Sequence, residues 1–233
     1  VKRHLNEYFY YGGLPEILLF KNKRAMLSSL YQKIYLGDIC ARNNIKNDRV
    51  LNILIKKMAE SVKQPLSYNR LKNVIVATGS PISVPTTIDY AGYAADSWLI
   101  LPMENEVGKL TEKEMQKKYY FVDNGLLNLF LMNSETSLLE NMVAVELCRR
   151  FGKKNVFFLN AEKEIDFIVP DEKLAIQVSY SIKDETTYNR EVPPLVRYAK
   201  AHEDWKCLLI TYDEEVTEEG IPVVPVWKWL MWV

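Results

Sequence analysis

The stretch from Leu138 to Tyr180 constrains the fold most, because it places acidic side chains inside otherwise apolar segments. Its first part has apolar residues at helical spacing, and Gly152 follows as a stop signal. On this predicted helix Glu146 projects into the middle of the apolar arc, and Glu140 lies at the edge of that arc. A carboxylate buried without a partner costs free energy, so both glutamates are predicted to have specific partners.

Three strands are predicted after this helix, at residues 156–159, 164–169 and 174–180, and the last two carry polar side chains. Residues 164–169 alternate, with Glu164 and Asp166 on one face and apolar residues on the other. Residues 174–180 place Gln177 and Ser179 on one face. Because side chains alternate with a period of two, the face that each of these residues occupies follows from its position in the strand.

An acid on a helix, an acid on a strand and an amide on the next strand are typical of a divalent-metal site in nucleases, since hard cations take oxygen ligands. The predicted catalytic and metal-binding residues are Glu140, Asp166 and Gln177, and we expect their side chains to converge on one cleft. With an amide in place of one carboxylate, the predicted cofactor is a weakly held Mg²⁺.

Five phrases in this order span nearly the whole chain: Tyr11–Glu16, Tyr120–Leu126, Leu139–Asn141, Glu164–Phe167 and Gly220–Trp227. With them, the order helix, three strands, helix, strand resembles the PD-(D/E)xK, or restriction-endonuclease-like, fold. More narrowly, the chain resembles the C-terminal half of a group of prokaryotic AAA-family ATPases. In that group a winged helix and a PD-(D/E)xK-like domain follow the ATPase module.

The resemblance implies an α+β or α/β chain in three parts. We predict a helical linker segment over residues 1–46, a winged-helix domain over residues 47–122, and a restriction-endonuclease-like αβββαβ domain over residues 123–233. The second helix of the last domain is predicted over residues 191–202, because Pro193 and Pro194 are tolerated only in a first turn. The expected partner of the chain is an N-terminal ATPase module that binds ATP, and the chain is expected to be a fragment without a phosphate loop of its own.

In a winged helix the second helix of the helix-turn-helix reads DNA. Here that helix, residues 83–98, contains no lysine or arginine to neutralise phosphates. Its predicted inward residues are Ile88, Ala91, Ala95 and Trp98, and its predicted exposed residues are Thr86, Thr87, Asp89, Tyr93 and Asp96. The nucleic-acid-binding residues are instead predicted on the hairpin around the polar loop 104–116, at Lys109, Lys113, Lys117 and Lys118. With 30 basic and 30 acidic residues, we expect any DNA binding to be weak and non-specific.

Working PD-(D/E)xK nucleases end their last motif in a lysine, which this resemblance places at Ser179. A serine cannot supply the cation that stabilises the developing phosphorane charge. Lys183 lies roughly 13 Å further along the strand, and Lys163 has the opposite parity to Asp166. The sequence therefore predicts a non-catalytic region that engages nucleic acid or protein. The alternatives are a metal-dependent DNA endonuclease and a pure protein-interaction or regulatory module.

The three cysteines are far apart and predict neither a disulfide framework nor a zinc site, which favours a reducing cytoplasm. No apolar run reaches the ~18 residues that a membrane span needs. The sequence leaves open whether DNA or protein is the partner, and whether the chain forms a homo-oligomer.

Overall fold

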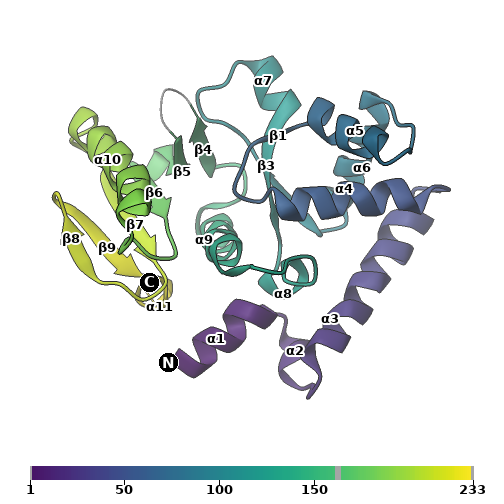
Figure 1. Ribbon diagram of the computed structural model, residues 1–233, viewed down its shortest axis with the longest axis horizontal. Helices are drawn as coiled ribbons and strands as arrows, with labels where there is room; N and C mark the ends of the chain where they lie inside the picture. Colours follow the sequence, from purple (N-terminus) through teal and green to yellow (C-terminus); the bar gives the residue numbers. More distant parts are fainter. Residues whose placement is uncertain (1, 161–163, 232–233) are drawn as a thin grey trace.

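The computed structural model describes residues 2–160 and 164–231, and it contains two β-sheets surrounded by helices (Figure 1). The mixed α/β class predicted from the sequence is confirmed. Within the described residues, every helix is too short or too polar to cross a lipid bilayer.

The chain begins with a run of helices: α1 (Lys2–Tyr11), α2 (Pro15–Leu18), α3 (Lys23–Gln32) and the π-helix η1 (Lys33–Ala41). The Asn22 side chain caps α3 by accepting a hydrogen bond from the Ala25 backbone N–H. Helix α1 packs on α8 and α9, and so ties the start of the chain to its middle (Figure 1).

The next part contains three helices and a small antiparallel sheet. Its elements are α4 (Asp48–Glu60), β1 (Leu66–Ser67), α5 (Tyr68–Ala77), α6 (Val84–Asp96), β2 (Ile100–Met103), α7 (Leu110–Met115) and β3 (Gln116–Phe121). The strands lie in the order β1-β3-β2. The three predicted helices and the hairpin are present in the expected order, but α7 lies in a segment that was predicted to be a loop. The winged-helix assignment itself stays a prediction.

The buried face of α6 differs from the predicted one. Thr87, Ala91 and Ala94 are buried, whereas Ile88 and Trp98 are exposed. Small residues let the helix approach its neighbours α4 and α5 closely, and the Thr87 hydroxyl is satisfied by donating to the Ser83 carbonyl at 2.8 Å. The absence of lysine and arginine from the exposed face still holds.

The remaining elements are six strands, which form one mixed sheet, and the helices around it. They are α8 (Asn124–Leu127), α9 (Glu135–Phe151), β4 (Phe157–Asn160), β5 (Glu164–Val169), the 3₁₀ turn η2 (Pro170–Glu172), β6 (Leu174–Val178), α10 (Glu185–Ala201), β7 (Lys206–Thr211), β8 (Val216–Glu218), β9 (Ile221–Pro225) and α11 (Val226–Leu230). The strand order is β4-β5-β6-β7-β9-β8. Strand β7 pairs in parallel with both β6 and β9, and the other pairs are antiparallel.

The sheet is covered on both faces. On one face Phe167, Ile176 and Leu208 join the large core that includes α9 and the preceding helices. On the other face Ala175 and Leu209 pack with residues of α10. Helix α9 therefore lies between the mixed sheet and the elements that precede it in the chain (Figure 1).

Helix α10 begins earlier than predicted. It starts at Glu185, with the Asp184 side chain accepting from the Thr187 backbone N–H at 2.9 Å, so Pro193 and Pro194 lie inside the helix rather than in its first turn. Each proline removes one backbone donor, and the carbonyls that lose it belong to Asn189 and Arg190, which are exposed residues. The N-cap at Asp184 and the apolar face of the helix therefore set its start, although the two prolines had indicated a start at residue 191.

Side-chain hydrogen bonds at Asn105 and Asp123 connect segments that are far apart in the sequence. The side chain of Asn105, just after β2, exchanges two hydrogen bonds of 3.0 Å with the backbone of Asn160 in β4. Asp123 caps α8 by accepting from Gly125 and also accepts from the Gly13 backbone N–H, both at 2.8 Å. Gly12 has a φ of +79°, and a Cβ there would lie 1.9 Å from an Asp123 carboxylate oxygen, so this contact requires glycine.

Candidate functional site

A cavity of about 400 Å³ lies at the edge where β5 and β6 meet α9 and α10. Its lining includes Glu140 from α9, Asp166 from β5 and Gln177 from β6. The three predicted side chains thus converge on one cavity, as their strand parity indicated. The register explains this, since Phe167 pairs with Ile176 and the neighbouring Asp166 therefore stands opposite Gln177.

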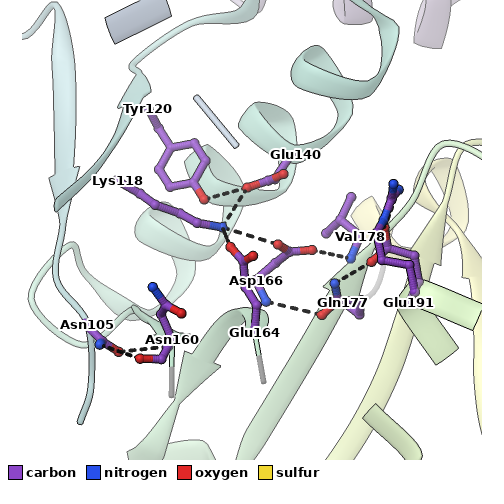
Figure 2. Close-up of polar contacts among 11 residues, drawn as sticks. Asn105, Lys118, Tyr120, Glu140, Asn160, Glu164, Asp166, Gln177, Val178 and Glu191 are labelled. Atoms are coloured by element: carbon purple, nitrogen blue, oxygen red, sulfur yellow. Dashed lines mark hydrogen bonds and ion pairs between the residues drawn. The ribbon is translucent and has the colours of Figure 1, made fainter. Parts of the chain in front are cut away.

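The centre of the site is an ammonium group that the sequence did not predict. Lys118 is fully buried, and its Nζ lies 3.3 Å from Glu140 Oε1, 3.3 Å from Asp166 Oδ1 and 3.0 Å from Glu164 Oε1 (Figure 2). The lysine comes from β3, and its three acidic partners come from α9 and β5. The cluster therefore joins the small antiparallel sheet to the mixed sheet. We call these four residues the Lys118 cluster.

Two predictions about lysines are corrected by this position. Lys118 was predicted to bind nucleic acid from an exposed hairpin, but its side chain has no exposed surface. The acid cluster was also predicted to lack a lysine, because Ser179 holds the motif position. Lys118 supplies an ammonium there from outside the αβββαβ segment. Lys183 is exposed and does not line the cavity, and Lys163 lies outside the described residues.

Charge is unevenly compensated in the Lys118 cluster, since three carboxylates share one ammonium. Burial alone would lower the pKa of Lys118, but the carboxylates outweigh it and raise the pKa above its ordinary value. Burial raises the pKa of Glu140 to about 7, against the attraction of Lys118. The two raised pKa values are compatible because one ammonium cannot compensate three carboxylates. The most buried carboxyl, that of Glu140, is the one that tends to hold a proton, whereas Glu164 is partly exposed to water.

Tyr120 is the second partner of Glu140. Its hydroxyl donates to Glu140 Oε1 at 2.8 Å, and burial raises the pKa of this tyrosine well above its ordinary value. The other glutamate of α9 is also satisfied, because Arg149 and Arg150 both donate to Glu146 and hold its pKa below the ordinary value despite burial. The prediction that both glutamates need partners is confirmed.

Gln177 does not direct its oxygen into the cavity. Its Oε1 accepts from the Asp166 backbone N–H at 3.3 Å, and its Nε2 donates to Glu191 Oε2 at 2.6 Å (Figure 2). A flipped amide would bring two donors together at Asp166, so the orientation is fixed by its partners. The predicted ligand set Glu140, Asp166 and Gln177 therefore does not fit Mg²⁺ as placed, since Lys118 already lies between the two acids.

The lysines of the predicted wing, which is the hairpin around the loop 104–116, are largely engaged within the chain. Lys117 pairs with Glu104 at 3.2 Å and Glu114 at 3.6 Å, and its side chain is 13% exposed. Lys113 lies over the Phe157 ring. Of the four predicted nucleic-acid-binding lysines, Lys109 alone is fully on the surface. Among the residues the structure describes, no group of three or more histidine, cysteine or acidic side chains is arranged to hold a metal ion.

Comparison with known proteins places the chain in a family. The chain belongs to the family described as a domain of unknown function (DUF8612), whose model matches residues 2–137. It is 30% identical to the uncharacterized protein MJ1544 of Methanocaldococcus jannaschii over 97% of the chain and 55% of that protein. An uncharacterized protein of Haemophilus influenzae is also 30% identical, over 99% of the chain and 58% of that protein.

The chain therefore spans a little over half the length of these curated relatives. No solved structure matches it significantly. The family match includes Lys118 and Tyr120, whereas the carboxylates of the cavity follow the matched residues.

Proposed function

We propose that this chain is a non-catalytic region that engages nucleic acid or protein within a larger cytoplasmic protein whose other part is an AAA-family ATPase module. The greater length of both relatives leaves room for such a module. One observation carries the non-catalytic part of the proposal. The ammonium of Lys118 fills the space between Glu140 and Asp166, where a nuclease of this type would hold its cation.

Displacing that ammonium is costly. A divalent cation would have to separate Lys118 from three carboxylates, two of them buried, and would also have to displace to solvent the proton that Glu140 tends to hold. The resident lysine therefore competes with any metal ion for the same oxygens. In this proposal the cluster stabilises the junction between the two sheets rather than catalysing a reaction.

A metal-dependent DNA endonuclease is the second candidate, and the position of Lys118 favours it. An ammonium 3.3 Å from each of two acids is the group that Ser179 cannot supply. The two candidates assign opposite roles to Lys118. In the first the lysine neutralises the acids, and in the second it is required for cleavage.

Incubation of plasmid and single-stranded DNA with Mg²⁺ or Mn²⁺ separates the two candidates. We expect no cleavage by the wild-type chain, by Asp166→Ala or by Lys118→Met. Metal-dependent nicking by the wild type that is lost in both variants would replace the proposal with the endonuclease. The ATPase part is tested separately by the gene sequence upstream of the codon for Val1, where a phosphate-loop motif is expected.

A further inference from the structure

The cavity beside the Lys118 cluster has walls of different chemistry. Its floor is acidic and buried, with Glu140, Asp166 and Glu191 among the lining residues. Its rim is basic and exposed. Lys63, in the turn after α4, and Arg190 and Arg197, of α10, are its exposed cations and come from two separate elements. The two arginines are seven residues apart, so they share one face of the helix.

The rim cations are available to a ligand to different degrees. Lys63 donates to the Thr136 hydroxyl at 3.0 Å and forms no ion pair in the described part of the chain. Arg197 has no ion-pair or hydrogen-bond partner among the described residues. Arg190 pairs with Glu191 at 2.7 Å but remains 68% exposed. Exposed cations from separate elements around one cavity can contact successive phosphates of one strand.

An aromatic ring completes the wall. Tyr180 lines the cavity and is half-buried, and its ring stacks on Tyr212 with centroids 4.8 Å apart and planes 19° from parallel. This contact fixes the orientation of the ring. Basic side chains beside a fixed aromatic ring are the combination that binds single-stranded nucleic acids, in which unpaired bases stack on the ring.

The acidic floor determines which part of a ligand can enter the cavity. A phosphate or an acidic side chain that entered deeply would meet Asp166 and Glu191, so negative groups must stay at the rim. The amino groups of bases can donate to carboxylates, as cytosine N4 does. A cavity of about 400 Å³ is also at the small end of the range for small-ligand sites, too small to admit a duplex.

We propose that this cavity binds one unpaired nucleotide of a single-stranded nucleic acid, with its base against Tyr180 and the flanking phosphates on Lys63, Arg190 and Arg197. The inference rests on the nucleic-acid branch of the proposed function and moves the contact surface from the wing to the cavity rim. It favours bases with an amino group, so a cytosine strand binds more tightly than a thymine strand.

Fluorescence anisotropy with labelled 12-nucleotide dC and dT strands and a labelled duplex tests the inference. With three phosphate contacts at about 0.7 each, the logarithmic salt slope is about −2, so affinity falls roughly 20-fold between 50 and 200 mM salt. We expect Lys63→Gln/Arg197→Gln to weaken dC binding at least about tenfold and to reduce the slope by about 1.4. Tyr180→Leu should weaken it at least about fivefold.

The matched control is Lys109→Gln/Lys113→Gln, which removes the same charge from the wing. It should leave dC binding within about twofold of wild type, and circular dichroism should show every variant folded. The inference is overturned if the wing variant weakens binding as much as the rim variant, if the duplex binds as tightly as the dC strand, if dT binds as tightly as dC, or if none of them binds at 50 mM salt.

Competition by poly-glutamate as effective as by unlabelled dC would instead identify a site for acidic polypeptides and also overturn the inference. None of these results bears on catalysis. Metal-dependent cleavage would remove the proposed function even if the rim bound single strands as described.

Discussion

Replacing Lys118 by methionine removes the ammonium from a site that retains its carboxylates. The side chain keeps a similar length and apolar stem, so the change is mainly one of charge. Breaking a buried ion pair from one side costs about 3 to 5 kcal/mol, because the partner charge is left uncompensated. Two of the three partners of Lys118, Glu140 and Asp166, are at least 94% buried, and the third is partly exposed.

The pH changes this cost in a predictable direction. Without Lys118 the pKa of Glu140 rises further, so this carboxyl takes a proton and becomes neutral. Protonation is easiest at low pH, and the loss should therefore shrink as the pH falls. We expect Lys118→Met to lower the free energy of unfolding by about 3 to 4 kcal/mol at pH 8 and by less at pH 5.5.

Urea unfolding followed by far-ultraviolet circular dichroism at both pH values measures this effect. The control Lys109→Met, on the surface, should change stability by less than about 0.5 kcal/mol. In the double variant Lys118→Met/Glu140→Gln, both charges are gone, and the loss should be about 1 to 3 kcal/mol smaller than the sum of the single losses. A loss below about 1 kcal/mol for Lys118→Met at pH 8, or strict additivity, would refute the buried cluster.

Three further predictions follow from the same contacts. In the wild type, Glu140 has a raised pKa when folded, so the folded state holds more protons than the unfolded state between about pH 4.5 and 7. The free energy of unfolding should therefore fall as the pH rises through this window, and its dependence on pH should be weaker in Glu140→Gln. Asp123→Ala should lower the free energy of urea unfolding by about 2 to 3 kcal/mol, because the backbone N–H groups of Gly13 and Gly125 lose their acceptor. A decrease of less than about 0.5 kcal/mol would show that water replaces this acceptor. Gly12→Ala should lower the melting temperature by more than about 4 °C, since its φ is +79° and its Cβ would meet Asp123; an unchanged temperature would contradict the tight approach.

Much of the site could be predicted from periodicity. The alternation of β5 and β6 fixed the faces of Asp166 and Gln177, and the helical spacing of α9 identified Glu140 as a carboxylate in need of a partner. These are local properties, set by periods of two and 3.6 residues, and they do not depend on the rest of the chain. The side chains that share a cavity were therefore predictable, whereas their contacts were not.

The sequence did not predict that Lys118 is the partner of Glu140 and Asp166, because these contacts are long-range. Lys118 lies 22 residues before Glu140 and 48 before Asp166 in the sequence. Residues 118–121 of β3 are all buried, so the strand shows no alternation that would direct a lysine inward or outward. The signal available was a lysine beside the run Tyr119, Tyr120 and Phe121, which indicates a buried strand.

Helix α6 shows a different limit. The sequence pattern directed Ile88 and Trp98 inward together with Ala91, but Ile88 and Trp98 are exposed, and Thr87 and Ala94 are buried beside Ala91. Close packing of helices depends on the shape of both partners, and only the tertiary structure sets that shape. The burial of Lys118 was missed for a related reason, because its partners lie on other elements; nucleic-acid binding by Lys109, Lys113 and Lys117 stays a prediction, although acids and an aromatic ring contact the last two.

In the proposed function, the ammonium of Lys118 takes the place of a metal ion between Glu140 and Asp166. Titration of Mn²⁺ at pH 7.5, with free Mn²⁺ followed by electron paramagnetic resonance, tests it most directly. We expect no wild-type binding tighter than roughly 1 mM, and tighter binding in Lys118→Met, whose carboxylates have lost their internal cation. Micromolar binding by the wild type that is lost in Asp166→Ala would contradict it.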